Sequence, residues 1–249
     1  MTGFYVISLR KLWSYWRIGA IALIAGMTWP ALLRSSPSSV RGGKNSSHIV
    51  WYVPTHQKVV ALTFDDGPSI HRTPAILKVL HDAHAHATFF VTGINAAKHP
   101  KILREEQLMG MQVENHTWGH INLRQHSQAQ IAADLRHANA VITKATGHTP
   151  TLIRPPYGAY SRTVVNTARS MGMTVVMWSW TEDSRDWSNP GVGTIVQNVL
   201  QHVQPGDIIL FHDGGASRQT VRALPIVLRD LSARGYRFVT VGQLMRMKS

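Results

Sequence analysis

The feature that most constrains the fold is a regular alternation between short apolar segments and segments with helical periodicity, from about residue 58 to residue 241. Short apolar runs bounded by turn residues are typical of buried strands. The segments between them carry apolar residues at three- and four-residue intervals, as in 73–85, which predicts amphipathic helices. Strands that alternate with helices predict an α/β architecture with a parallel sheet.

The expected elements are compatible with a barrel. We expect strands at 58–64, 87–92, 111–114, 151–154, 174–178, 207–211 and 237–241, and helices at 73–85, 100–110, 127–146, 161–171, 194–203 and 217–234. This alternation over about 200 residues is barrel-like, but it is tight for a regular eight-fold barrel.

Composition divides the chain into three segments. Residues 1–34 contain an uncharged apolar run at 18–33 with basic and aromatic neighbours, which predicts a membrane anchor or an export signal. As a helix this run would span roughly 24 Å, less than the roughly 30 Å hydrocarbon core of a bilayer, unless the flanking aromatic residues extend it. We favour an uncleaved anchor because no clear small-residue cleavage site follows; a buried helix is the remaining alternative.

Residues 35–47, rich in Ser, Gly and Pro, predict a flexible linker before a folded domain at 48–249.

The charge and the cysteine count exclude several classes of function. The net charge is +13, but six of the 26 basic residues lie in 1–47, which has no acidic residue. A solvated basic face accounts for the remaining excess, with an anionic cell-wall surface as the alternative, and no nucleic-acid-reading motif is present. We therefore expect no nucleic-acid partner. The absence of cysteine excludes disulfides, thiolate metal sites and a cysteine nucleophile.

Polar side chains suited to acid–base chemistry follow five of the expected strands. They are Asp65 and Asp66, His116 and His120, Arg154, Asp183 and Asp186, and His212 and Asp213. In an α/β barrel the carboxyl ends of the strands form one rim, where active sites assemble. The sequence therefore predicts a site on this rim.

Residue types at the rim are compatible with a catalytic metal site that has an acid and a base beside it. Two imidazoles four residues apart, His116 and His120, together with one carboxylate form a common zinc-binding set. The spacing alone is common by chance, and an acidic pair such as Asp65–Asp66 can be only a turn. Combined, however, one carboxylate can bind a metal while its neighbour acts as a base. Arg154 could hold a carboxylate, and a histidine at a buried rim can act as a general acid.

Five motifs occur in a fixed order along the chain. They are TFDDGP at 63–68, HTWGH at 116–120, RPPY at 154–157, DSRDW at 183–187 and IILFH at 208–212. The set resembles the five motifs of the NodB-type polysaccharide deacetylases, carbohydrate esterase family four, over about residues 56–246. Ile208 stands where the family often has leucine. The resemblance implies a distorted, partly irregular (β/α) barrel of the NodB-homology type and a polysaccharide deacetylase catalytic domain at 48–249.

The resemblance also implies a role for each motif residue. Asp66, His116 and His120 would bind one divalent metal, with Zn²⁺ expected and Co²⁺, Ni²⁺ or Mn²⁺ as alternatives. Asp65 would be the general base, Arg154 would orient it, and the backbone N–H of Tyr157 would face the oxyanion. His212 would be the general acid, tuned by Asp186. Trp187, Leu210 and Pro156 would form the substrate pocket.

The expected function is removal of acetyl groups from N-acetylglucosamine units of peptidoglycan or of chitin-type chains. Two alternatives remain: an acetyl-xylan O-esterase with the same site, and a non-catalytic wall-binding homologue. We expect a polysaccharide substrate, a monomeric catalytic domain and membrane contact through the N-terminal segment. The protein would then be extracytoplasmic, anchored or secreted, and face the cell wall.

Overall fold

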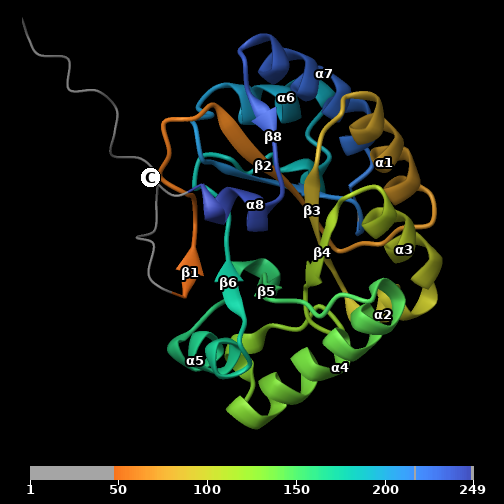
Figure 1. Ribbon diagram of the computed structural model, residues 1–249, viewed down its shortest axis with the longest axis vertical. Coiled ribbons are helices and arrows are strands. Elements are labelled where there is room, and N and C mark those ends of the chain that lie inside the picture. The colour runs from red at the N-terminus through yellow and green to blue at the C-terminus, as the bar shows by residue number, and fades with distance from the viewer. Residues whose placement is uncertain (1–47, 216, 248–249) are drawn as a thin grey trace, which may run out of the picture. The chain divides into compact units, whose positions relative to one another are not determined.

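The computed structural model describes residues 48–215 and 217–247 (Figure 1). The expected anchor at 1–34 and linker at 35–47 lie outside the described residues. No helix within the described part of the chain is both long and apolar enough to span a bilayer. The predicted domain at 48–249 is described here without residue 216 and its last two residues.

A parallel sheet forms the centre of the domain. Its strands are β1 (Ile49–Val50), β2 (Val59–Asp65), β3 (Ala87–Val91), β4 (Gln112–Asn115), β5 (Leu152–Ile153), β6 (Thr174–Val176), β7 (Ile208–His212) and β8 (Arg237–Phe238). The order is β1-β6-β5-β4-β3-β2-β7, with β8 also paired to β2, and each pair is parallel. Among the described residues, the two end strands of this path share no ladder, and only an isolated bridge joins Tyr52 to Asp207 near them. The sheet is thus a curled, incomplete barrel, which confirms the expected distorted (β/α) fold.

All the helices but the last cover the outside of the curled sheet, and the last lies across one end of it (Figure 1). They are α1 (Arg72–Asp82), α2 (Gly93–Lys98), α3 (Pro100–Leu108), α4 (Gln128–Thr146), α5 (Arg162–Ser170), α6 (Val192–Leu200), α7 (Thr220–Ala233) and α8 (Val241–Arg246). Short 3₁₀ turns lie at Leu123–Gln125, Pro156–Gly158 and Asp186–Ser188.

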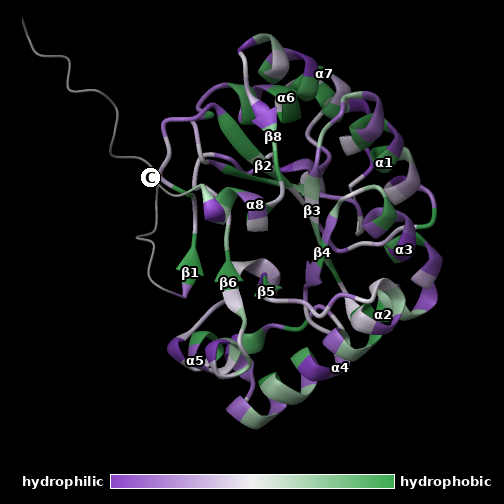
Figure 2. Cartoon of the chain, viewed as in Figure 1, coloured by the Kyte–Doolittle hydropathy of each residue, from purple (hydrophilic) through white to green (hydrophobic). Residues whose placement is uncertain are grey.

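Both faces of β2 are buried, because its side chains alternate between two apolar clusters. Val60, Leu62 and Phe64 belong to the apolar cluster that includes α1 and α7, whereas Val59 and Ala61 belong to a second cluster with α8. Successive side chains of a strand point to opposite faces, so the second set faces the barrel interior. Hydrophobic colouring accordingly dominates β2, while the outer helices mix both kinds of residue (Figure 2).

Helix α8 closes the end of the barrel opposite the strand carboxyl ends. The N–H of Val241 donates to Thr88 Oγ1 at 2.9 Å, and the N–H of Gly242 donates to Gln112 Oε1 at 2.8 Å. Thr88 and Gln112 lie near the amino ends of β3 and β4. The other end of the barrel is therefore left open for a site.

The expected helices and strands are confirmed apart from their boundaries and three short elements. Helix α4 begins after Ser127, which forms a capping box with Gln130, and ends at Gly147 with φ of 75°. The sequence patterns did not predict β1, α2 and α8. The expected strand 237–241 was wrong in its second half, because Thr240 caps α8 and its side chain accepts a hydrogen bond from the N–H of Gln243.

Candidate active site and metal centre

Two neighbouring strands deliver an acid and an imidazole to the same level of the open end. Asp65 is the last residue of β2 and His212 the last of β7, and the two are direct partners in the parallel register. The expectation that these two motifs meet at one rim is thus confirmed.

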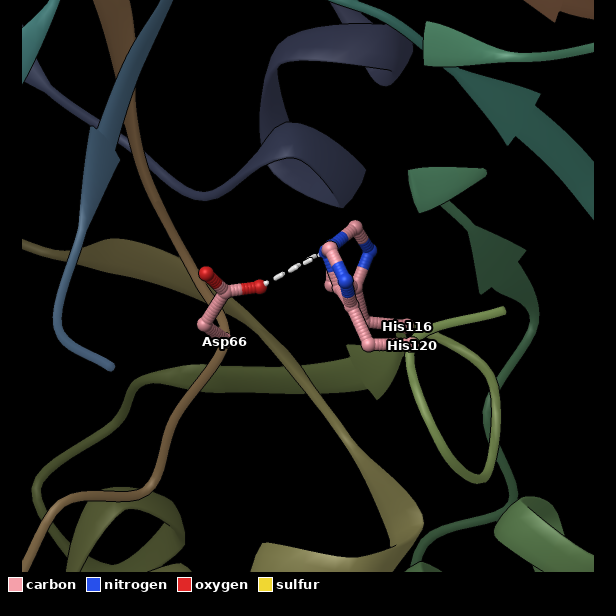
Figure 3. A group of neighbouring side chains, drawn as sticks. All are labelled: Asp66, His116 and His120. Carbon is pink, nitrogen blue, oxygen red and sulfur yellow. Dashed lines mark ion pairs between the residues drawn. The ribbon is translucent and has the colours of Figure 1, made fainter. Parts of the chain in front are cut away.

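Asp66, His116 and His120 lie together as a possible metal site. Asp66 Oδ1 lies 3.4 Å from His116 Nε2 and 3.1 Å from His120 Nε2. One ligand atom from each residue falls within 4.8 Å of the others. Figure 3 shows the Asp66 carboxylate facing the two imidazole rings.

Hydrogen bonds behind the histidines favour a cation between these atoms. His116 Nδ1 lies 2.6 Å from the Arg154 carbonyl oxygen. A carbonyl can only accept, so Nδ1 carries the proton and Nε2 presents a lone pair to Asp66. His120 Nδ1 lies 3.1 Å from Tyr157 Oη, and the Tyr157 hydroxyl can donate to the His120 carbonyl, so the same tautomer, with Nδ1–H donating to Oη, is compatible with this arrangement. Such partners fix the tautomer of metal-binding histidines.

The environment of Asp66 also indicates that a metal ion would fit between these three residues. Its Oδ1 atom is buried and has no hydrogen-bond partner among the described residues. A buried, anionic oxygen that faces two imidazole lone pairs repels them unless a cation lies between. The donor set therefore fits a divalent metal of the kind that imidazole and carboxylate bind.

Left-handed backbone at several positions shapes the metal-binding loops. Asp66, Thr117, His120 and Tyr157 have φ of 75°, 67°, 56° and 60°. Such conformations in non-glycine residues cost about 1–3 kcal/mol each and cluster at functional sites. The surrounding structure must therefore hold them.

Helices α2 and α4 hold the loop that carries the two histidines. The N–H groups of Gly93 and Ile94 donate to the carbonyls of Thr117 and Trp118 at 2.9 and 3.0 Å. The N–H of Trp118 donates to Asp134 Oδ1 of α4 at 2.9 Å. Sequence reasoning missed these supports, because α2 is a six-residue helix with little apolar periodicity.

Arg154 fixes Asp65 from inside the barrel. It is fully buried, and its Nη1 donates to Asp65 Oδ1 at 2.8 Å. The same nitrogen donates to Thr63 Oγ1, and Nη2 donates to the Met177 carbonyl. Burial lowers the pKa of the guanidinium, while Asp65 opposes that shift, so the ion pair persists. One Asp65 oxygen is thereby held, and Oδ2 lies 3.8 Å from His116 Nε2.

Asp186 holds His212 at two points. Its Oδ1 accepts from His212 Nδ1 at 2.7 Å, and its Oδ2 accepts from the His212 backbone N–H at 2.8 Å. The hydroxyls of Ser217 and Thr220 also donate to Oδ2. Burial lowers the pKa of His212, but Asp186 raises it more strongly, to about 9. The His212 imidazole is therefore protonated at neutral pH. The contacts of the Ser217 and Thr220 hydroxyls were not predicted, because nothing in the sequence links these residues to Asp186.

A cavity of about 440 Å³ unites the five motifs. Its lining includes Asp65, Asp66, His116, His120, Tyr157, Trp187, Leu210 and His212. Trp187, one of the lining residues, is 53% exposed to solvent. One expectation was wrong: Pro155 lines the cavity, whereas Pro156 is buried at the start of its 3₁₀ turn.

Of the other two rim acids, Asp183 lines the cavity and Asp213 does not. Asp213 is buried against Gly67, where a Cβ would lie only 2.1 Å from its carboxylate, and the Thr73 hydroxyl donates to it. Burial raises the pKa of Asp213 to about 7. Its position indicates support of the turn after β2 rather than contact with a ligand.

Comparison with known proteins agrees with this site. Residues 52–176 match the family model for polysaccharide deacetylase. A peptidoglycan-N-acetylglucosamine deacetylase of Bacillus cereus is 40% identical over 204 residues, which cover 82% of this chain and 95% of the relative. A chitooligosaccharide deacetylase of Bradyrhizobium is 38% identical over 198 residues, covering 74% and 90%.

Solved structures extend the agreement to the fold. A peptidoglycan N-acetylglucosamine deacetylase in complex with an N-oxidanyl-benzamide superposes with a TM-score of 0.76 at 33% identity, covering 80% of this chain and 92% of that one. A CE4 family pseudoenzyme from Bacillus anthracis superposes with a TM-score of 0.75 at 27% identity, covering 82% and 70%. With sequence, fold and motif order in agreement, this chain belongs to the polysaccharide deacetylases of carbohydrate esterase family four.

Proposed function

We propose that the protein is a metal-dependent N-deacetylase acting on N-acetylglucosamine units of a cell-wall or chitin-type polysaccharide. The observation that carries the proposal is the convergence, on one cavity, of three metal-binding donors, a carboxylate fixed by a buried arginine and a protonated imidazole. These groups supply what amide hydrolysis requires. The balanced reaction consumes one water and releases acetate and a free amine.

The donor set Asp66, His116 and His120 would hold the ion, with zinc as the expected metal. A bound divalent cation supplies Lewis-acid chemistry: it polarises a carbonyl and lowers the pKa of water from about 15.7 towards 7.

Asp65 is the proposed general base. Arg154 holds its Oδ1 and leaves Oδ2 on the side of His116, where it can accept a proton from the attacking water. The Tyr157 N–H is the proposed donor to the oxyanion that develops on the acetyl oxygen. One donor of this kind contributes roughly 2.7–4 kcal/mol in other hydrolases.

His212 is the proposed general acid. Amide cleavage requires protonation of the nitrogen, because an amine anion is too poor a leaving group. His212 is protonated at neutral pH, and Asp186 fixes its Nδ1, so Nε2 is left to donate. Base and acid steps each typically contribute about 10²–10⁴-fold.

The pairing of His212 with Asp186 predicts a shift in the pH profile of the Asp186→Asn variant. Wild-type activity should fall as pH rises through the raised pKa of His212, because the imidazole then loses its proton. In the variant, the hydrogen bond and charge of Asp186 no longer oppose burial and only the more distant Asp65 and Asp66 still raise the pKa of His212, so this pKa falls and the alkaline limb moves to lower pH. Activity measured from pH 6 to 10 would test this. An alkaline limb that stays in place would remove His212 as the acid tuned by Asp186.

The names of relatives favour the substrate class. Similar proteins are called peptidoglycan N-acetylglucosamine deacetylase and chitooligosaccharide deacetylase. The exposed Trp187 and the nearby Trp178 offer aromatic faces to a sugar ring at the cavity. The predicted N-terminal anchor would place the domain outside the cytoplasm, facing the cell wall.

Acetate and free amine should be measured together on purified peptidoglycan, N-acetylglucosamine oligomers and acetylxylan. The proposal expects equal amounts of acetate and amine from at least one of the first two. Acetate without amine, released only from acetylxylan, would instead support an O-esterase. No release from any of them would support the non-catalytic alternative.

A further inference from the structure

A cavity of about 440 Å³ lies at the end of the barrel that α8 closes, and we call it the α8 cavity. It is lined by the loop from α1 to β3, by the end of α7 and β8, and by α8 (Figure 1). Arg237 of β8 pairs with Val59, the first residue of β2, whereas Asp65 is the last. Because β2 has seven residues, its two ends lie roughly 20 Å apart at about 3.3 Å per residue. The α8 cavity is therefore separate from the catalytic groups.

Three basic side chains line the α8 cavity, and its lining contains no acidic residue. They are Arg237, His84 and His86. The guanidinium and both imidazoles carry N–H donors. Arg237 Nη2 donates to the neutral side chain of Gln57 at 3.1 Å, and no carboxylate among the described residues forms an ion pair with this guanidinium. The cavity thus presents a cation that has no counter-charge in its walls.

The charged residues around the cavity do not neutralise this guanidinium. Asp82 in the last turn of α1 pairs with Lys78 at 2.8 Å. Asp230 in the last turn of α7 pairs with Arg234 at 2.5 Å. Lys58 Nζ donates to the Arg234 carbonyl at 2.8 Å, so a further positive charge lies beside β8. An anion that enters the cavity therefore meets a positive potential.

His84 occupies a position where glycine would be the least strained residue. It follows the end of α1 with φ of 50°, in the left-handed region. The N–H of His84 donates to the His81 carbonyl, and the N–H of Ala85 donates to the Leu80 carbonyl, both at 2.9 Å. This pair of hydrogen bonds ends many helices, usually with glycine at the left-handed position. Strained left-handed residues cluster at functional sites, so a histidine here indicates a use for its side chain.

His86 is held in place by its neighbours. Its backbone N–H donates to the Phe238 carbonyl at 3.4 Å. Its ring lies against Gly110, where a Cβ would be 3.0 Å from Cε1 and 3.1 Å from Nδ1. Nε2 is thus the ring nitrogen that is left for a ligand. Neither the His84 ring nor the His86 ring forms a hydrogen bond with another residue in the part of the chain that the structure describes.

A phosphate ester matches this combination of groups. The paired N–H groups of a guanidinium suit either a carboxylate or a phosphate. Donors that come from three segments of the chain suit the tetrahedral oxygens of a phosphate better than the planar pair of a carboxylate. The cavity is also larger than a bare phosphate, and Val239 and Met247 give it apolar walls for an organic part.

We propose that the α8 cavity binds a phosphate ester, with Arg237, His84 and His86 as the residues that hold the phosphate. This inference is independent of the proposed deacetylase function. A soluble ester and the headgroup of an anionic phospholipid share this chemistry. The predicted N-terminal anchor makes a lipid headgroup an accessible source.

Calorimetry of the zinc-loaded full chain in neutral detergent, with glycerol 1-phosphate as the probe, tests the inference. Arg237→Gln removes the charge. His84→Gly removes one imidazole and relieves the left-handed backbone, so its Tm should not fall. Both variants should bind the probe about tenfold or more weakly. Arg169→Gln is the matched control and should bind like the wild type, since Arg169 is exposed on α5 and lines neither this cavity nor the catalytic one.

Comparison of the variants isolates the α8 cavity. Any binding of the probe at the metal centre is common to all these proteins, so it does not contribute to the differences between them. Turnover of N-acetylglucosamine oligomers should stay at the wild-type value in all three variants. No binding by the wild type, or equal affinity in the wild type and Arg237→Gln, would overturn the inference. Acetate that binds as tightly as glycerol 1-phosphate would overturn the choice of a phosphate.

A short-chain lipid separates the two sources of the ester. Dihexanoyl phosphatidylglycerol would be titrated in the same way, with dihexanoyl phosphatidylcholine as the control for the acyl chains. Binding of the former that is tighter than that of glycerol 1-phosphate, and that is lost in Arg237→Gln, would support a lipid headgroup. Binding of glycerol 1-phosphate alone would support a soluble ester. Lipid binding that is the same for both headgroups and unaffected by Arg237→Gln would overturn the lipid source.

Discussion

The Asp65→Asn variant should keep its metal and lose about 10²–10⁴-fold in kcat, the usual contribution of a general base. The amide has nearly the shape of the carboxylate, so Asp66, His116 and His120 should keep their positions. The asparagine amide cannot accept a proton from water as the Asp65 carboxylate does, because an amide is far less basic than a carboxylate. Metal content by elemental analysis and kcat on N-acetylglucosamine oligomers would be measured on the same preparation.

This substitution also leaves the buried Arg154 without its charged partner. Breaking a buried ion pair typically costs about 3–5 kcal/mol of folding free energy, so Tm should fall and folding must be checked at the assay temperature. Asp82→Asn is a suitable control, because Asp82 is exposed on α1, where it pairs with Lys78. A folded, metal-loaded Asp65→Asn protein with near-normal turnover would remove Asp65 as the base.

His116→Ala and His120→Ala should each weaken metal binding by more than about 100-fold. Even the loss of a residue that only orients a metal ligand commonly costs 10–100-fold in metal affinity or activity. Activity should fall with metal content, and excess zinc should restore it only in part. The measurement is competition with a metal-binding dye, followed by assay at saturating zinc.

His81→Ala provides the matched control for these variants. His81 is exposed on α1, outside the Asp66–His116–His120 group. It should leave metal affinity and turnover unchanged. Wild-type metal affinity in His120→Ala would contradict its assignment as a ligand.

The site residues that could be predicted from the sequence are those that lie at the carboxyl ends of strands. Asp65 and His212 end two apolar strands and are direct partners in their parallel register. The motif order then identified the family, which the comparisons confirm. A single barrel rim was therefore predictable from the alternation of elements.

The parts that sequence reasoning missed depend on contacts between distant segments. Ser217 and Thr220 reach Asp186 only because α7 begins beside the 3₁₀ turn Asp186–Ser188. Asp134 meets Trp118 because α4 packs along the histidine loop. Two short helices, α2 and α8, have too few turns to show a clear apolar period. No local pattern carries such information.

The choice between Pro155 and Pro156 is a similar case. Both are prolines in one motif, and only the direction of the 3₁₀ turn decides which one faces the cavity.

The most direct test of the account is amine and acetate release from N-acetylglucosamine pentamer by metal-stripped protein, before and after zinc is restored. The account predicts almost no release from the stripped protein, equimolar release of the two products after zinc is added, and none from zinc-loaded Asp65→Asn. Undiminished release from fully stripped protein, or none from the zinc-loaded wild type on any N-acetylated polymer, would contradict it.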